Sequence, residues 1–352
     1  MHPARGHLPR GWKLAALGAI LGLAATSQAQ TTPDLNISGY IRAEYGDGDR
    51  YPAEKGGDSF DVSQISVGLT AIYENLEAFV NLGATNVLEE RSPSSDAFVT
   101  DAFITWKGGA SGNLIAGLQP ILFGLKPAGF AGDRSIQAGL EYGGGGGFAV
   151  SQQAAPAIVY QYGPGTTFSI KAGAFDTSSS TVDYQLATGL GPIDGSSLSD
   201  NFFFDLRFGQ AGTGGLYGYA GWEDRYIGGA VNEARDIVDI GVGWSNSKID
   251  ISVEYIDMDQ AFFGLTESET YTIAEATFHL SQRVNLYFDL GEADVTDRET
   301  TRYGLVYAIN PAAALQIEFS KDEFGSRATL LPEGVVAGQD IDSVDFRLSF
   351  SF

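Results

Sequence analysis

The sequence predicts an all-β protein, a 16-stranded antiparallel transmembrane β-barrel with an inward-folded constriction loop. Three observations lead to this prediction. Apolar and polar residues alternate strictly at the end of the chain, the same alternation recurs throughout it, and large aromatic residues stand at one end of every second strand. A period of two places apolar and polar side chains on opposite faces of a strand.

The last strand shows the alternation most clearly. From residue 344 onward every second residue is apolar: Val344, Phe346, Leu348, Phe350 and Phe352. The other face carries an acid and an arginine, Asp345 and Arg347. An apolar outer face combined with a charged inner face is typical of a transmembrane barrel strand.

An export signal precedes the barrel. Residues 1–29 contain Arg5, Arg10 and Lys13 but no acid, then an apolar run over 14–25, and they end on Ser27-Gln28-Ala29. This order is typical of a secretory signal peptide, which we expect to be cleaved after Ala29. The alternative, a membrane anchor, is disfavoured because a bilayer needs about 20 apolar residues. The mature barrel would then comprise residues 30–352.

Composition narrows the function classes. Removing the signal leaves 18 basic residues against 44 acidic ones, a net charge of −26, and the chain has no Cys. The acidic balance argues against nucleic acid as a partner, because phosphates would be repelled. The mature part lacks a run of eighteen apolar residues, so it is either soluble or a closed barrel.

Sixteen segments alternate with a period of two. In chain order they are 35–45, 65–73, 76–85, 97–106, 113–118, 157–162, 166–175, 202–209, 216–223, 236–244, 248–257, 270–280, 284–291, 300–309, 314–321 and 341–352. Seven short turns alternate with eight longer loops. An even strand count, with both termini and the short turns on one side, is the plan of outer-membrane barrels.

The strands that run toward the short turns end on outward aromatic residues. These are Tyr73, Trp106, Tyr162, Phe208, Trp244, Tyr307 and Phe352, and only the strand ending at Leu280 lacks one. Amphipathic rings gather where lipid meets water, so this row predicts an aromatic girdle at one membrane interface.

The strand count, the export signal and the terminal Phe352 together resemble the Gram-negative general diffusion porins, particularly the acidic alphaproteobacterial, Rhodobacter-like type. The resemblance implies an outer-membrane homotrimer of separate pores, surrounded by lipopolysaccharide and outer-membrane lipid. It also implies that Phe352 is the signal for the barrel assembly machinery, and that one long loop folds inward as a constriction.

The longest connection, residues 119–156, is the candidate constriction loop. Unlike the other loops it has apolar content: Ile121, Leu122, Phe123, Leu125, Phe130 and Ile136. A loop packed against an inner wall would need such residues, whereas a solvated loop would not. The five glycines at 143–147 lack the strand-to-helix turn of a phosphate-binding loop, so we expect them to pass close to the wall.

Alternation also predicts which charges line the pore. We expect five bases to face the lumen, namely Arg42, Lys171, Arg207, Arg302 and Arg347, with Asp133 and Glu141 as the acids of the loop. Arginines facing acidic residues across a waist would set up a transverse field. Alternatively, each arginine neutralises an inward acid such as Asp345 or Glu44; selectivity rings and internal ion pairs use the same residue types.

Sixteen strands make a barrel too wide for side chains to plug. We therefore expect a water-filled channel for passive diffusion of small hydrophilic solutes and ions, preferring cations because the mouth is acidic. The alternatives are a solute-specific outer-membrane channel and a plugged structural or adhesive barrel. An enzyme is not expected, since His279 is the only mature His. No cofactor is expected, although the acid pairs Asp47/Asp49, Asp257/Asp259 and Asp340/Asp342 are candidate Ca²⁺ ligands.

Overall fold

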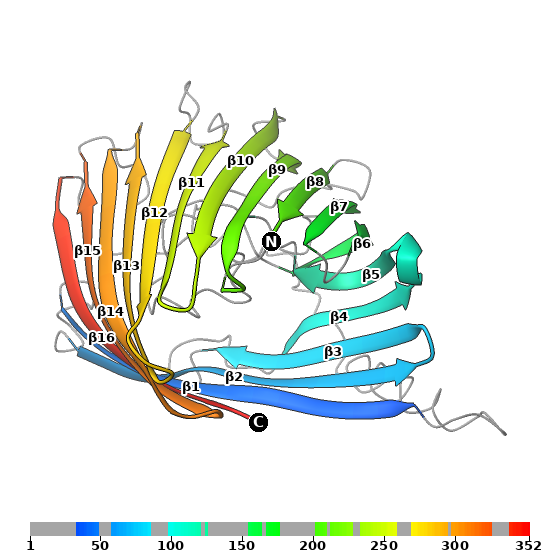
Figure 1. Cartoon of the computed structure of the whole chain (residues 1–352), viewed down its shortest axis with the longest axis horizontal. Coiled ribbons are helices and arrows are strands. Elements are labelled where there is room, and N and C mark those ends of the chain that lie inside the picture. The colour runs from blue at the N-terminus through cyan, green and yellow to red at the C-terminus, as the bar shows by residue number, and fades with distance from the viewer. Residues whose placement is uncertain are drawn as a thin grey trace, which may run out of the picture.

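The computed structural model shows one closed barrel (Figure 1). It describes residues 33–48, 58–85, 98–120, 124–125, 154–163, 167–176, 201–209, 212–227, 233–258, 269–294, 297–325 and 338–352. The expected signal peptide and most of the 119–156 loop, with Asp133 and Glu141, lie outside these residues.

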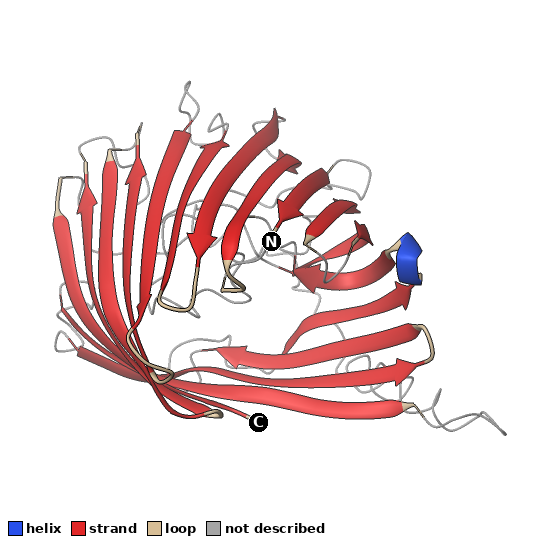
Figure 2. Cartoon of the chain, viewed as in Figure 1, coloured by secondary structure: helices blue, strands red, loops and turns tan. Residues whose placement is uncertain are grey.

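The sixteen predicted strands are all present, and each pairs with its neighbours in sequence in an antiparallel sense. Their bounds are β1 Asp34–Gly48, β2 Asp58–Tyr73, β3 Leu76–Thr85, β4 Phe98–Lys107, β5 Asn113–Pro120, β6 Ala154–Tyr162, β7 Phe168–Phe175, β8 Phe202–Phe208, β9 Gly215–Ile227, β10 Glu233–Ser245, β11 Ile249–Met258, β12 Glu269–His279, β13 Val284–Ala293, β14 Arg298–Asn310, β15 Ala313–Phe324 and β16 Asp340–Ser351. Figure 2 shows that strands make up nearly all of the described chain, with one short 3₁₀ helix, Gly109–Ser111, between β4 and β5.

The first and last strands close the barrel. β1 pairs with β16 from Tyr40 opposite Ser351 to Gly48 opposite Ser343. Beyond this ladder, Gly39 and Phe352 exchange two backbone hydrogen bonds of 3.0 Å each. The Phe352 ring lies across Gly39, where a Cβ atom would come within 2.6 Å of it. The terminal aromatic residue is thus part of the seam.

The connections follow the predicted alternation, but three of the longer loops are clearly shorter than expected. The short turns are stabilised by their own side chains, as where Asn246 Oδ1 accepts hydrogen bonds from the backbone N–H of Lys248 and Ile249. On the other side the connection from β1 to β2 spans 49–57, that from β9 to β10 spans 228–232 and that from β13 to β14 spans 294–297. These three are shorter than expected because both flanking strands extend beyond their predicted ends.

The barrel has an apolar exterior and a polar interior, as the alternation predicts. Leu35 and Ile37 on β1 are 71% and 67% exposed, while Glu318 and Asp345 on β15 and β16 are buried. Among the described residues no helix is long and apolar enough to cross a membrane. An apolar outer surface around a polar lumen is the arrangement of a transmembrane barrel.

Six of the seven predicted girdle residues are exposed, namely Trp106, Tyr162, Phe208, Trp244, Tyr307 and Phe352, and Tyr73 is half-buried. Leu280, which ends the strand without an aromatic residue, is exposed as well. A second aromatic row crosses the outer face toward the other rim: the rings of Phe288, Tyr303 and Phe319 stack with centroids 6.4 and 5.2 Å apart. Beyond it the outward positions of β15 become charged, and Lys321 pairs there with Asp340 at 3.5 Å. The two rows therefore delimit the apolar band.

Glycines let aromatic side chains cross the inner wall. Tyr217 on β9 lies opposite Gly243 on β10, and its hydroxyl donates a 2.6 Å hydrogen bond to Asp250 on β11. A Cβ at residue 243 would collide with this ring. Tyr287 crosses Gly304 in the same way and donates to Glu318 at 2.6 Å. Each tyrosine thus reaches an acid two strands away.

We expect Gly243→Ala to destabilise the barrel, because the new methyl group would displace the buried Tyr217 ring from Asp250. Overpacking of this kind costs about 1–3 kcal/mol. The measurement is the temperature at which the folded barrel loses its heat-modifiable migration on electrophoresis. The control is Gly243→Ala with Tyr217→Leu, in which the methyl group meets no ring; equal losses from Gly243→Ala with Tyr217 present or absent would contradict the prediction.

Candidate functional site: the charged inner wall

The inner wall of the barrel carries more acids than bases. Among the described residues ten carboxylates are buried, against three arginines. The acids are Asp101, Asp205, Glu223, Asp239, Asp250, Glu254, Asp289, Glu318, Asp322 and Asp345, and the arginines are Arg298, Arg302 and Arg347. Buried charges of this density need partners, because an unpaired one is costly.

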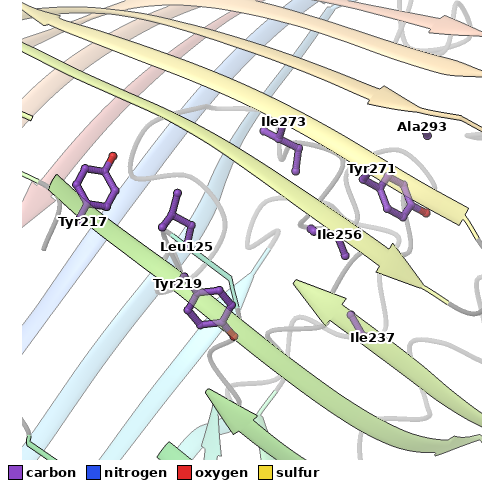
Figure 3. Packing of buried hydrophobic residues seen from close by; sticks show 8 residues of the cluster. All are labelled: Leu125, Tyr217, Tyr219, Ile237, Ile256, Tyr271, Ile273 and Ala293. Carbon is purple, nitrogen blue, oxygen red and sulfur yellow. The ribbon is translucent and has the colours of Figure 1, made fainter. Parts of the chain in front are cut away.

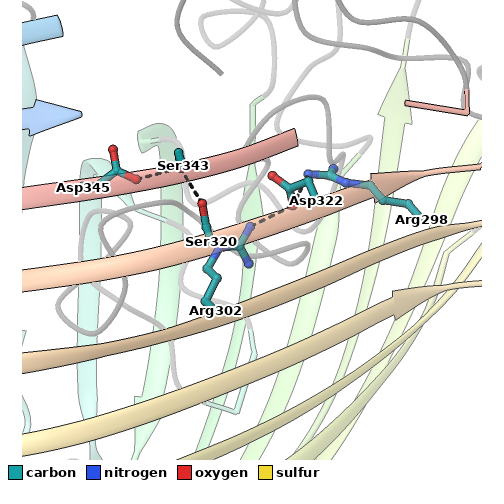
Figure 4. Close-up of polar contacts among 6 residues, drawn as sticks. All are labelled: Arg298, Arg302, Ser320, Asp322, Ser343 and Asp345. Carbon is teal, nitrogen blue, oxygen red and sulfur yellow. Dashed lines mark hydrogen bonds and ion pairs between the residues drawn. The ribbon is translucent and has the colours of Figure 1, made fainter. Parts of the chain in front are cut away.

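One charged region lies on β14 to β16 (Figure 4). Arg298 and Arg302, four residues apart on β14, share the carboxylate of Asp322 on β15, with Nη2 to Oδ1 distances of 3.4 and 3.3 Å. Next to them a chain of short hydrogen bonds joins Ser320 to Ser343 at 2.6 Å and Ser343 to Asp345 at 2.8 Å. The region therefore holds two neighbouring polar groups on three adjacent strands.

The seam holds a second ion pair. Arg347 Nε donates a 2.5 Å hydrogen bond to Glu44 Oε1, and the two residues are register partners across the β1–β16 closure. Arg42 lies two residues from Glu44 with its guanidinium 4.9 Å from the centre of the Tyr40 ring. Arg347 thus forms the type of internal neutralising pair that the sequence left open, with Glu44 as the acid.

The arginines expected on one stretch of wall do not lie at one height along the barrel axis. In the sheet register Arg302 lies opposite Ser320 and then Ser343, whereas Arg347 lies opposite Gln316 and Glu44. Arg302 and Arg347 are therefore four residues apart along the strand direction, roughly 13 Å at 3.3 Å per residue. Their acidic neighbours also differ, since Arg302 pairs with Asp322 and Arg347 with Glu44.

The opposite wall holds the other two predicted bases. Lys171 on β7 is the register partner of Asp205 on β8, and Asp205 also lies 3.7 Å from Arg207 Nε. Arg207 stacks on Tyr219 with its guanidinium 4.4 Å from the ring centre. β8 is eight strands from β16 in a closed barrel of sixteen, so the two charged regions face each other across the lumen.

Between β5 and β6 the structure describes Gly124 and Leu125 of the 119–156 segment, and both lie against this opposite wall. The backbone N–H of Leu125 donates a 2.5 Å hydrogen bond to Glu254 on β11, and its carbonyl accepts one of 3.4 Å from Arg207. The Leu125 side chain occupies the space above Gly241, where a Cβ atom would come within 2.8 Å of it. The wall thus holds Leu125 by two hydrogen bonds to its backbone, one with Glu254 and one with Arg207, and by the space above Gly241.

Arg207, one of the five bases expected to face the lumen, contacts Leu125. Leu125 follows β5 in the sequence but contacts β8, a contact that the alternation within β8 cannot reveal.

Leu125 belongs to an apolar cluster on the inner wall that sequence reasoning missed (Figure 3). Its other members are Tyr217, Tyr219, Ile237, Ile256, Tyr271, Ile273 and Ala293, all buried on β9 to β13. A signal was present in β10, where Ile237 and Val238 are adjacent, so both faces are apolar at that point. Strict alternation would have placed a polar residue at 237.

Two further sites considered from the sequence are the turn at His279 and the acid pairs proposed to bind Ca²⁺. His279 Nδ1 lies 2.9 Å from Asn285 Oδ1, and Ser281 Oγ accepts hydrogen bonds from Arg283 and Val284, so both side chains serve the turn. Within the described ranges no group of three acids or histidines lies close enough to hold a metal ion. Asp49 and Asp259, members of the proposed Ca²⁺ pairs, fall outside those ranges, as do Asp133 and Glu141.

No protein-family model matches the sequence, and neither does any curated protein sequence. Solved structures do match. The anion-selective porin from Comamonas acidovorans has a TM-score of 0.62 at 14% identity, covering 91% of this chain and 100% of that one. The outer-membrane channel DcaP of Acinetobacter baumannii has a TM-score of 0.60 at 12% identity, with coverages of 93% and 100%.

OmpF of Salmonella typhi, solved in complex with daunomycin, has a TM-score of 0.62 at 11% identity and covers 91% of this chain and 98% of its own. Identities this low establish the shape and strand order shared with these proteins. The chain therefore has the fold of the outer-membrane porins, a closed sixteen-stranded antiparallel β-barrel.

Proposed function

We propose that the protein is an outer-membrane channel for passive diffusion of small hydrophilic solutes and ions. The observation that carries the proposal is a closed barrel of sixteen strands whose inner wall is polar. Strands about 4.8 Å apart and tilted by about 40° give a barrel roughly 30 Å across, too wide for wall side chains to fill. The likeness to porins and channels of known structure supports the same function.

The proposed channel prefers cations. Ten buried carboxylates against three buried arginines in the described wall support this sign, as does the mature charge of −26 inferred from the sequence. A negative lumen raises the local concentration of cations. The name of the Comamonas porin states the opposite preference for that protein; the wall charges of the present chain are the reason for our proposal.

The narrowest section is proposed to lie between the 119–156 segment and the arginines of the seam. Its support is the position of Leu125, fixed to Glu254 and Arg207 on the wall opposite β16. Arg42, Arg302 and Arg347, with Asp133 and Glu141 of the segment, are the proposed waist residues. Because Arg347 and Arg302 already pair with Glu44 and Asp322, their positive field would be partly neutralised.

The proposed partners follow from the fold and the resemblance. We propose a homotrimer exported by the signal peptide 1–29 and inserted by the barrel assembly machinery. Lipopolysaccharide and outer-membrane lipid would surround the apolar band. The outward acids beyond that band, Asp340 and Asp342 among them, support contact with lipopolysaccharide phosphates through Ca²⁺. No resident cofactor is proposed.

The cation preference is tested by reversal potentials of the purified protein in planar bilayers under a KCl gradient. We expect a potential of the sign set by K⁺ in dilute salt, shrinking as salt rises, because the screening length falls from about 10 Å at 0.1 M to about 3 Å at 1 M. A Cl⁻-directed potential in dilute KCl would overturn the proposal.

The same recording separates the rival functions. Ohmic steps in groups of three support a trimer of open pores. Saturable block by one sugar supports a solute-specific channel instead. If the correctly folded protein shows no conductance at all, the result supports a plugged structural barrel and contradicts the proposal of a diffusion channel.

The role of the 119–156 segment is tested by detaching Leu125. Gly241→Val fills the space that the leucine occupies, and Glu254→Gln weakens its backbone anchor. We expect both variants to show higher single-channel conductance and more open-channel noise, because the segment no longer holds one position. Loss of the buried leucine contact lowers stability by about 1.5–3 kcal/mol at most.

Glu318→Gln is the matched control for Glu254→Gln, since it removes the same charge from the inner wall on β15, four strands from β11. If Gly241→Val and Glu254→Gln conduct no differently from Glu318→Gln, the segment does not set the narrowest section.

Deletion of Phe352 is expected to reduce insertion into the outer membrane. The change removes an outward ring and two backbone hydrogen bonds that join Gly39 to the end of β16. The measurement is the yield of heat-modifiable barrel in outer-membrane fractions at native expression. Phe350→Leu, which keeps an apolar side chain and the full length, is the control; wild-type yield of the deletion variant would disprove an assembly role.

A further inference from the structure

We propose that the channel rectifies: cations pass more readily from the rim of the long connections to the rim of the short turns than in the reverse direction. The inference rests on the proposed channel function and adds a direction to it. The charged residues that carry it lie at the two rims, apart from the proposed waist.

The first observation is the distribution of charge between the two rims. The long connections join strand ends at one rim of the barrel and the short turns join them at the other. In the sequence the eight long connections contain sixteen acidic and six basic residues. The seven short turns contain three charged residues in total, Glu74, Lys248 and Arg283. The connections are therefore acidic at one rim and close to neutral at the other.

The second observation is a row of acids at the acidic rim, on the four adjacent strands β13 to β16 (Figure 1). Glu292 lies opposite Glu299, and Glu299 lies opposite Glu323. Glu323 in turn lies opposite Asp340. Neighbouring strands are about 4.8 Å apart, so the row places four carboxylates within about 15 Å. Like charges directly opposite each other destabilise a sheet, so pairing within the sheet does not account for this row.

One base accompanies the row of acids. Lys321 pairs with Glu323 and, at 3.5 Å, with Asp340. The excess of acid remains when the inner face of the same strands is included. Beyond the level of Phe288, Tyr303 and Phe319, β13 to β16 and the connection 294–297 carry three bases, Arg298, Arg302 and Lys321. The acids there are Asp289, Glu292, Asp294, Asp297, Glu299, Asp322, Glu323, Asp340 and Asp342.

The other rim of the same region carries the opposite sign. Three turns, 246–248, 280–283 and 311–312, join β10 to β11, β12 to β13 and β14 to β15. They contain Lys248 and Arg283 and no acid, and both basic side chains are exposed. Strands of one wall thus run from an acidic rim to a weakly basic one.

A difference of charge between its two mouths gives a pore a preferred direction. A negative rim concentrates cations and excludes anions, so cations carry most of the current in that section. Near the other rim both ions carry current. When cations enter at the acidic rim, salt therefore accumulates in the lumen and the conductance rises. When the potential is reversed, salt is depleted from the lumen and the conductance falls.

The test is the current–voltage relation of single channels in a planar bilayer of neutral phospholipid, with a chelator that removes divalent ions from the acids. In about 0.01 M KCl the screening length is about 30 Å, and we expect the currents at equal potentials of opposite sign to differ about twofold. In about 1 M KCl the screening length is about 3 Å, and we expect the relation to be linear.

The orientation of each channel is read from Gln282→Cys, at an exposed position in a short turn, because the chain has no cysteine of its own. A thiol-reactive polymer too large to enter the pore changes the current noise when it is added on the side of the short turns. A larger current when cations leave on that side supports the proposal. A larger current in the reverse direction overturns it.

Two sets of substitutions separate the rims. The first set neutralises the row of acids by Glu292→Gln, Glu299→Gln, Glu323→Gln and Asp340→Asn. We expect the ratio of the two currents to fall toward one and the cation preference to decrease. The second set, Lys248→Glu with Arg283→Glu, makes the other rim acidic. It is expected to bring the ratio toward one while the cation preference increases, since the two mouths become alike in sign.

Glu318→Gln is the control, because it removes an acid from the inner wall between the rims, and it is expected to keep the ratio of the wild type. Folding of every variant is checked by heat-modifiable migration. A ratio that survives loss of the row, or a linear relation of the conducting wild type in dilute salt, overturns the rectification and leaves the channel function intact. A correctly folded protein that does not conduct refutes the channel function, and the rectification with it.

Discussion

The structure depends on the pairing of every strand edge. In lipid no water is available to hydrogen-bond a free backbone N–H or C=O, so a sheet can span the membrane only when it is closed. Here β16 meets β1, and the reciprocal hydrogen bonds between Phe352 and Gly39 carry the ladder to the last residue. Closure then fixes which face of each strand meets lipid and which meets the lumen.

Closure also concentrates charge. Because side chains alternate, the charged residues that lie level with the apolar band must share the interior, where they find partners on neighbouring strands. Arg347 pairs with Glu44 across the seam, and Asp322 serves two arginines of β14. The wall is therefore a series of local networks rather than a uniform ring of charge. Its net excess of acids remains after pairing, and Arg302 retains unused donors.

Glycine positions decide how close other groups approach this wall. Gly243 and Gly304 leave room for tyrosines that reach acids two strands away, and Gly241 leaves room for Leu125. Backbone atoms of the long segment then use Glu254 and Arg207 as acceptor and donor. Glycines thus allow tyrosines to link neighbouring strands at Gly243 and Gly304, and they allow the 119–156 segment to contact the wall at Gly241.

The sequence by itself determined the sixteen strands, the direction of their side chains and the aromatic row, because a period of two is a local property of each strand. It also predicted by position which bases face inward. Only the tertiary structure decided their neighbours: Arg302 and Arg347 lie in different rows because register is set by pairing around the whole barrel. The contact of Arg207 with Leu125 and the apolar cluster around Ile237 join residues from distant strands, and no local pattern encodes such distances.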